Sequence, residues 1–140
     1  MRAYSPKRAG AMLAIDTNIV VRYLTADHPE QSPKAKSLID GEEVFVCTTV
    51  LLETEWVLRS VYDFAPADIV KALTAFAGLP RVTLEDAPAA AAALDWTLKG
   101  LDFADAPHLA KTQGCDGFAS FDRRLAKAAK DVCGVEVRTP

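Results

Sequence analysis

From residue 12 onward, short apolar runs alternate with longer segments of helical periodicity, and this alternation constrains the fold more than any other feature. Apolar runs at 12–15, 44–47, 81–84, 117–121 and 135–138 have the length of buried strands. Helical spacing or helix-boundary residues mark the segments 17–26, 29–40, 48–62, 66–77, 87–98, 104–113 and 122–130. Short apolar strands joined by helices predict an α/β fold, with a mainly parallel sheet of about five short strands flanked by helices on both faces.

The length of 140 residues suits one domain with one hydrophobic core. We expect that domain to span residues 12–140 and residues 1–11 to be a disordered extension or tag, because the first strand-like run opens at Met12. The extension carries Arg2, Lys7 and Arg8 and no acid, so without it the formal charge falls from −3 to −6. A net-acidic domain is not expected to coat nucleic acid, since nonspecific affinity comes from neutralising phosphates.

Composition excludes several other classes of protein. Half of the residues are apolar and a quarter are charged, so the chain is expected to fold. No apolar run approaches the roughly 18 to 20 residues that span a bilayer, and the first residues lack a signal-like apolar stretch. We therefore expect a cytoplasmic protein without membrane contact. Cys47, Cys115 and Cys133 lack CxxC spacing and a histidine cluster, which predicts neither a disulfide framework nor a zinc site.

Two aspartates follow predicted strands directly. Asp16 ends the run at 12–15 and Asp122 ends the run at 117–121, each just before a helix. Either residue alone is explained as a helix N-cap. Together, two carboxylates at the carboxyl ends of parallel strands lie at one edge of a sheet, which favours a shared site.

Glu53 lies on a predicted helix that is apolar nearly all round. With Thr49 and Ser60 it forms a polar stripe, and no basic residue stands three or four positions after it. We expect its carboxylate to be buried, and a buried carboxylate without a partner takes up a proton or binds a cation. Glu55 has Arg59 four residues later, which predicts a surface ion pair.

Asp102 and Asp105 precede a helix whose start is confined by Pro107. A cap and first-turn acid explain one of them, and we expect Asp105 to belong to the site. Asp16, Glu53, Asp105 and Asp122 then form an oxygen-only set of ligands, which suits Mg²⁺ or Mn²⁺ better than Zn²⁺. Such ions hold phosphates and activate water, so phosphodiester hydrolysis is the predicted chemistry. His108, one turn after Asp105, is interpreted as a surface or half-buried histidine.

In four segments the chain resembles the PIN-domain ribonucleases, and among them the VapC toxins of bacterial toxin–antitoxin pairs. The segments are LAIDTN at 13–18, VLLETEWVL at 50–58, DFADAPHLA at 102–110 and SFDR at 120–123, and the resemblance covers residues 12–140. It implies a single PIN-like domain whose acidic metal site is formed by Asp16, Glu53, Asp105 and Asp122, with Asn18 and Ser120 as supporting polar groups. Pro107 departs from the pattern, where an ordinary helix former is expected.

The same resemblance implies a Mg²⁺-dependent endoribonuclease that acts as a toxin, with Mn²⁺ able to substitute. It implies RNA as the substrate and a cognate antitoxin protein that occludes the acidic pocket.

Basic residues near the predicted site are candidates for binding the RNA backbone, although a solvated helix face explains most of them equally well. They are Arg22, Arg123, Arg124, Lys127 and Lys130. The apolar residues Trp56, Val57, Leu58 and Tyr62 exceed what one helix face buries in a small core, which favours a homodimer.

Two alternatives stay open from the sequence. A receiver-like phosphoacceptor domain also uses an acidic pocket on a parallel sheet, but it needs paired acids after the first strand and a lysine after the last, and neither is present. A catalytically silent PIN-like binding module is disfavoured because all four acids are present.

Overall fold

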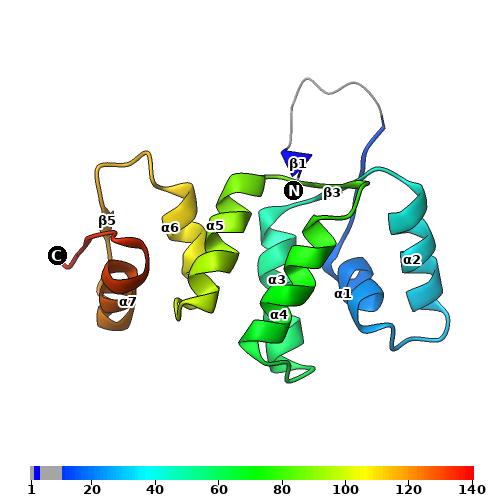
Figure 1. Ribbon diagram of the computed structural model, residues 1–140, viewed down its shortest axis with the longest axis horizontal. Coiled ribbons are helices and arrows are strands. Elements are labelled where there is room, and N and C mark those ends of the chain that lie inside the picture. The colour runs from blue at the N-terminus through cyan, green and yellow to red at the C-terminus, as the bar shows by residue number, and fades with distance from the viewer. Residues whose placement is uncertain (1, 4–10) are drawn as a thin grey trace. The chain divides into compact units, whose positions relative to one another are not determined.

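A computed structural model describes residues 2–3 and 11–140 of the chain (Figure 1). These residues form two compact units, which divide the chain after Ala87. Each unit contains parallel strands and helices, so the predicted α/β class is confirmed. No helix in the described ranges is long and apolar enough to cross a membrane.

The first unit contains a four-stranded parallel sheet in the order β1-β4-β3-β2. Its strands are β1 (Arg2–Ala3), β2 (Leu13–Ala14), β3 (Val44–Val46) and β4 (Val82–Leu84). β3 and β4 are central, and their valines and leucine are almost completely buried, as expected for strands covered on both faces. Leu13 of the edge strand β2 is 46% exposed.

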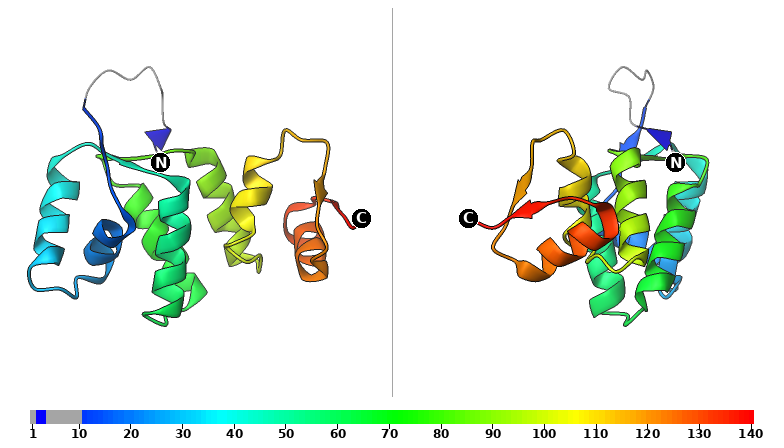
Figure 2. Two further views of the ribbon diagram at one scale, coloured as in Figure 1. Left: turned by 180° about the vertical axis from the view of Figure 1, so that it is seen from behind. Right: turned by 60° about the vertical axis from the view of Figure 1, so that its left-hand side comes forward.

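Four helices belong to the first unit, namely α1 (Thr17–Thr25), α2 (Gln31–Gly41), α3 (Thr48–Ser60) and α4 (Pro66–Ala77). Pro66 starts α4 at a position where no backbone N–H is needed, and Gly78 caps its end. α1 packs against α2 and α3, and α3 packs against α4 (Figures 1 and 2). Val20, Ile39, Leu58 and Phe76 are among the fully buried side chains of this core.

The second unit contains α5 (Ala87–Leu98), α6 (Ala106–Lys111) and α7 (Arg123–Cys133), with a two-stranded parallel sheet of β5 (Phe118–Ala119) and β6 (Val137–Arg138). α5 begins at Ala87, the last residue before the division. The core of the second unit contains Leu94, Leu101, Phe103 and Leu109. α7 begins at the N-cap Asp122 and ends at Gly134, whose φ of 69° favours glycine.

All five predicted strands are present, but they belong to two hydrogen-bonded sheets rather than one. β1 was not predicted. It falls within the predicted N-terminal extension, where Arg2–Ala3 pair with β4 and so differ from the expected disorder. The other residues of that extension, 1 and 4–10, lie outside the described residues.

Candidate functional site

Asp16 connects β2 to α1. Its backbone is extended, and its Oδ1 accepts a hydrogen bond of 2.8 Å from the backbone N–H of Thr17. The residue therefore caps α1, as its position after the strand indicated. Among the described contacts, none uses Oδ2, so one oxygen of this exposed carboxylate remains able to bind a ligand.

A cavity of about 360 Å³ opens beside Asp16 in the first unit. Asn18 and Arg22 of α1, Glu53 of α3 and Tyr62 contribute polar side chains to its wall. Four predicted site residues are thus brought together around one hollow, namely Asp16, Asn18, Arg22 and Glu53. Two carboxylates and an amide give this wall the oxygen donors that hard divalent ions prefer.

Glu53 is exposed, so the prediction that its carboxylate is buried was wrong. The buried residues of α3, namely Leu51, Thr54, Glu55 and Leu58, fall within an arc of about 100°, and Glu53 lies roughly opposite that arc. Thr49, Glu53 and Ser60 do lie on one side of α3, but that side is exposed and faces away from the core of this unit.

Glu55 is the buried acid of α3, contrary to the predicted surface pair. Its side chain is 8% exposed, and its two oxygens accept hydrogen bonds of 3.0 and 3.3 Å from Nε and Nη2 of Arg59. The predicted ion pair exists, but its acidic member is inside. The bidentate ion pair with Arg59 accounts for the burial of this carboxylate, so no metal ion has to be invoked to balance its charge.

Asp105 occupies the N-cap position of α6 without a side-chain cap hydrogen bond. The nearby Asp102 makes the hydrogen bond to the backbone instead: its Oδ1 accepts from the N–H of Ala104 at 3.0 Å. Burial raises the pKa of Asp105, and the negative charges of Asp102 and Asp122 raise it further, while His108 lowers it. Asp105 is thus a half-buried acid that lies near two other acids and makes no cap hydrogen bond.

Asp122 caps α7. Its Oδ1 accepts hydrogen bonds from the N–H groups of Arg124 at 2.9 Å and Leu125 at 3.1 Å. Ser120 Oγ accepts a 3.0 Å hydrogen bond from the Asp122 N–H, which fixes the backbone of the aspartate. Ser120 therefore contacts the backbone of Asp122, and its role as a supporting group of a metal site stays a prediction. No described contact uses Oδ2 of Asp122.

The four acids therefore occur as two pairs, one in each unit. Asp16 and Glu53 share a cavity, whereas Asp105 and Asp122 are close enough for the charge of one to raise the pKa of the other. In the described part of the chain, no three His, Cys, Asp or Glu side chains are grouped as ligands of a metal ion. The donor chemistry of each pair fits Mg²⁺ or Mn²⁺, because it offers carboxylate oxygen without sulfur.

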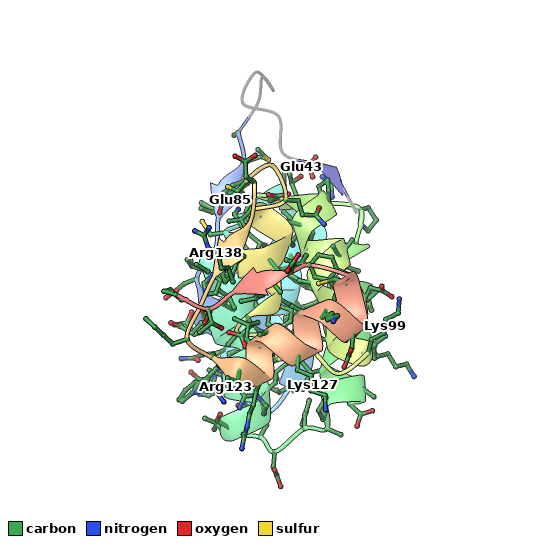
Figure 3. All side chains as sticks on the ribbon, turned by 90° about the vertical axis from the view of Figure 1, so that its left-hand side faces the viewer. Glu43, Glu85, Lys99, Arg123, Lys127 and Arg138 are labelled. Atoms are coloured by element: carbon green, nitrogen blue, oxygen red, sulfur yellow. The ribbon has the colours of Figure 1, made fainter. Side chains whose placement is uncertain are left out.

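The basic candidates differ in their surroundings. Arg123, Arg124, Lys127 and Lys130 are exposed on α7, and Figure 3 shows Arg123 and Lys127 on the same side of that helix. Arg22 instead is half-buried and hydrogen-bonded to Asp27, Gln31 and Tyr62. This network was not predictable from local sequence, because no local motif connects Arg22 with Asp27, Gln31 and Tyr62.

His28 has a structural role. Its Nδ1 accepts hydrogen bonds from the backbone N–H groups of Glu30 and Gln31, at 3.2 and 2.9 Å, at the start of α2. This geometry satisfies N–H groups that the first turn of a helix leaves without partners. His108 is exposed on α6, as expected.

A family model for the PIN domain matches residues 13–131 of this chain, which is most of its length. A search of curated proteins found no match. The matched range includes all four acids, and it begins at β2 and ends within α7.

Proposed function

Because the chain belongs to the PIN-domain family, whose members are typically metal-dependent nucleases, we propose that it is a Mg²⁺-dependent endoribonuclease that uses Asp16, Glu53, Asp105 and Asp122 as metal ligands. The match over residues 13–131 is the observation that carries this proposal. Mn²⁺ is expected to substitute, since it prefers the same oxygen ligands.

The local geometry of the acids supports their assignment. Asp16 and Asp122 each follow a strand, and each uses Oδ1 to cap a helix while Oδ2 takes part in no described hydrogen bond. Capping fixes each carboxylate, so little side-chain freedom is lost when a ligand binds. Glu53 faces the same cavity as Asp16, and Asp105 shares a local negative potential with Asp122.

A bound divalent ion would supply Lewis-acid stabilisation of the phosphate and an activated water. The residues of the chain have separate tasks. The carboxylates would act as metal ligands, Ser120 fixes the backbone of Asp122, and Asn18 contributes a neutral polar group beside Asp16. Arg123, Arg124, Lys127 and Lys130 are proposed to contact RNA phosphates, which an acidic chain must otherwise repel.

The preference for RNA and the toxin role follow from the resemblance to VapC toxins, and both are part of this proposal. A cognate antitoxin is expected to bind over the acidic cavity. A homodimer is proposed through α3, because Trp56 is 54% exposed and Val61 is also exposed. Leu58, which the sequence analysis assigned to the same surplus of apolar surface, is instead fully buried and is not part of that surface.

The direct experiment is incubation of the purified chain with total RNA and Mg²⁺, with and without chelator. Asp16→Asn, Glu53→Gln and Asp105→Asn should each abolish cleavage without unfolding the chain, since each keeps the shape of the side chain and removes a charge. Asp68→Asn, at an exposed acid of α4 outside the site, is the matched control and should cleave normally. Equal cleavage by wild type and Asp16→Asn would refute the assigned site, and cleavage that survives chelation would refute metal dependence.

The toxin role has its own test in cells. Production of the wild-type chain alone should arrest growth, whereas Asp16→Asn should be harmless at equal soluble yield. Normal growth with wild-type protein and no antitoxin present would contradict the toxin role and leave the nuclease proposal standing.

A further inference from the structure

Arg22 brings a positive charge to the cavity that contains Asp16 and Glu53. It lies on α1, six residues after Asp16, and its side chain is 31% exposed. Of the described residues that line this cavity, Arg22 is the one that carries a positive charge. The two carboxylates repel a phosphodiester. A positive charge in the same wall offsets that repulsion and attracts the phosphates of an RNA strand.

The guanidinium of Arg22 is held from three directions. Its Nε donates to Oε1 of Gln31 at 2.9 Å, and its Nη1 donates to Oδ1 of Asp27 and to the hydroxyl of Tyr62, each at 3.3 Å. These partners come from the start of α2, from the loop after α1 and from the residues after α3. None of the described contacts uses Nη2, which leaves N–H donors for a ligand.

Asp27 anchors this arrangement. Its Oδ2 accepts a 2.6 Å hydrogen bond from the hydroxyl of Tyr62, and its Oδ1 accepts a 2.7 Å hydrogen bond from the hydroxyl of Thr25. The Tyr62 hydroxyl, with smaller contributions from Thr25 and Arg22, lowers the pKa of Asp27 to about 2. Asp27 is therefore ionised at neutral pH and keeps both Arg22 and Tyr62 in a fixed orientation.

We propose that Arg22 binds a phosphate oxygen of single-stranded RNA beside the acidic pair, and that Tyr62 and Asp27 are positioning residues that hold its guanidinium in the cavity wall. This inference rests on the proposed function and deepens it by naming the group that receives the substrate. A guanidinium that is already ordered loses little freedom when it binds, which favours affinity. A purely structural tie between α1, α2 and Tyr62 would require neither the cavity nor the unused Nη2.

The test measures binding of a fluorescent single-stranded RNA oligonucleotide as a function of salt, with Ca²⁺ in place of Mg²⁺ to suppress cleavage. Each phosphate neutralised on a single strand contributes about 0.7 to the slope of log affinity against log salt. Arg22→Gln should lower that slope by about 0.7 and weaken binding by about tenfold, the loss of one charge-assisted contact. Lys71→Gln, at an exposed lysine of α4 that does not line the cavity, is the matched control and should leave the slope unchanged.

The variant Tyr62→Phe tests the positioning of the Arg22 guanidinium separately from its charge. It keeps the ring and the charge of Arg22 but removes the hydroxyl, so the salt slope should stay at the wild-type value while affinity falls by about threefold. Arg22→Lys keeps the charge but cannot reproduce the fork of hydrogen bonds, and it should behave in the same way. Thermal melts establish that each variant is folded, and Arg22→Met, which removes the same charge, replaces Arg22→Gln if the latter does not fold.

The outcomes distinguish this inference from the proposed function. If the wild type binds RNA and Arg22→Gln binds it with the same slope and affinity, the role of Arg22 is refuted and the nuclease proposal stands. Wild-type affinity in both Tyr62→Phe and Arg22→Lys would refute the positioning role. If the wild type neither binds nor cleaves RNA, the proposed function and this inference fail together.

Discussion

Substitutions of Asp122 distinguish its two roles, the helix cap seen in the structure and the proposed role as a metal ligand. Oδ1 of Asp122 accepts two backbone hydrogen bonds at the start of α7. Asn is an equally good N-cap, so Asp122→Asn should change the free energy of unfolding by less than about 0.5 kcal/mol. Asp122→Ala removes the cap and should cost about 1 kcal/mol, which lowers the Tm of a chain of this length by about 4 °C.

RNA cleavage should respond differently from stability. Both variants remove the negative charge, so both should lose Mg²⁺-dependent cleavage, although only Asp122→Ala is destabilised. Urea unfolding and cleavage of the same preparations give the two readouts. Asp122→Asn with wild-type cleavage would refute the metal role and leave Asp122 as a helix cap alone. Asp122→Ala with wild-type stability would refute the energetic value of the cap.

Three further results are expected. Glu55→Gln should lower the free energy of unfolding by about 1 kcal/mol in urea melts and leave cleavage intact, since Arg59 is partly exposed and screened. Tyr62→Phe should raise the pH of acid unfolding, because the lowered pKa of Asp27 gives stability that is present above pH 3.8 and lost as the pH falls towards about 2. The raised pKa of Asp105 makes stability depend on pH in the opposite direction. Without metal its contribution is present below pH 3.8 and lost as the pH rises through the folded-state pKa, so Asp105→Asn should flatten that loss in thermal melts in chelator.

Strand and helix positions followed from local sequence because each depends on neighbouring residues. The apolar runs at 44–47 and 81–84 became the central strands β3 and β4, and α5 has the predicted bounds 87–98. β1 could not be predicted, since Arg2–Ala3 has no apolar pattern and is defined by its pairing with β4. The distribution of strands between two sheets likewise depends on long-range pairing rather than on local pattern.

The sequence supplied the candidate acids but not the surroundings in which they lie. α3 is apolar nearly all round, so the sequence did not show which face packs, and Glu53 and Glu55 were assigned the wrong burial. Asp16 and Asp122 were predictable, because a strand followed by Asp and a helix is a local signal. The contact between Arg22 and Tyr62 joins residues 40 positions apart and has no such signal.

Direct measurement of Mn²⁺ binding tests the central claim that these four carboxylates are ligands of divalent ions. Calorimetric titration of the metal-free chain should show saturable binding. Asp16→Asn, Glu53→Gln, Asp105→Asn and Asp122→Asn should each weaken it by at least about tenfold, since even the loss of a group that only orients a ligand costs 10- to 100-fold. Asp68→Asn should bind Mn²⁺ like the wild type. Unchanged affinity in all four variants, or no saturable binding by the folded wild type, would contradict the account.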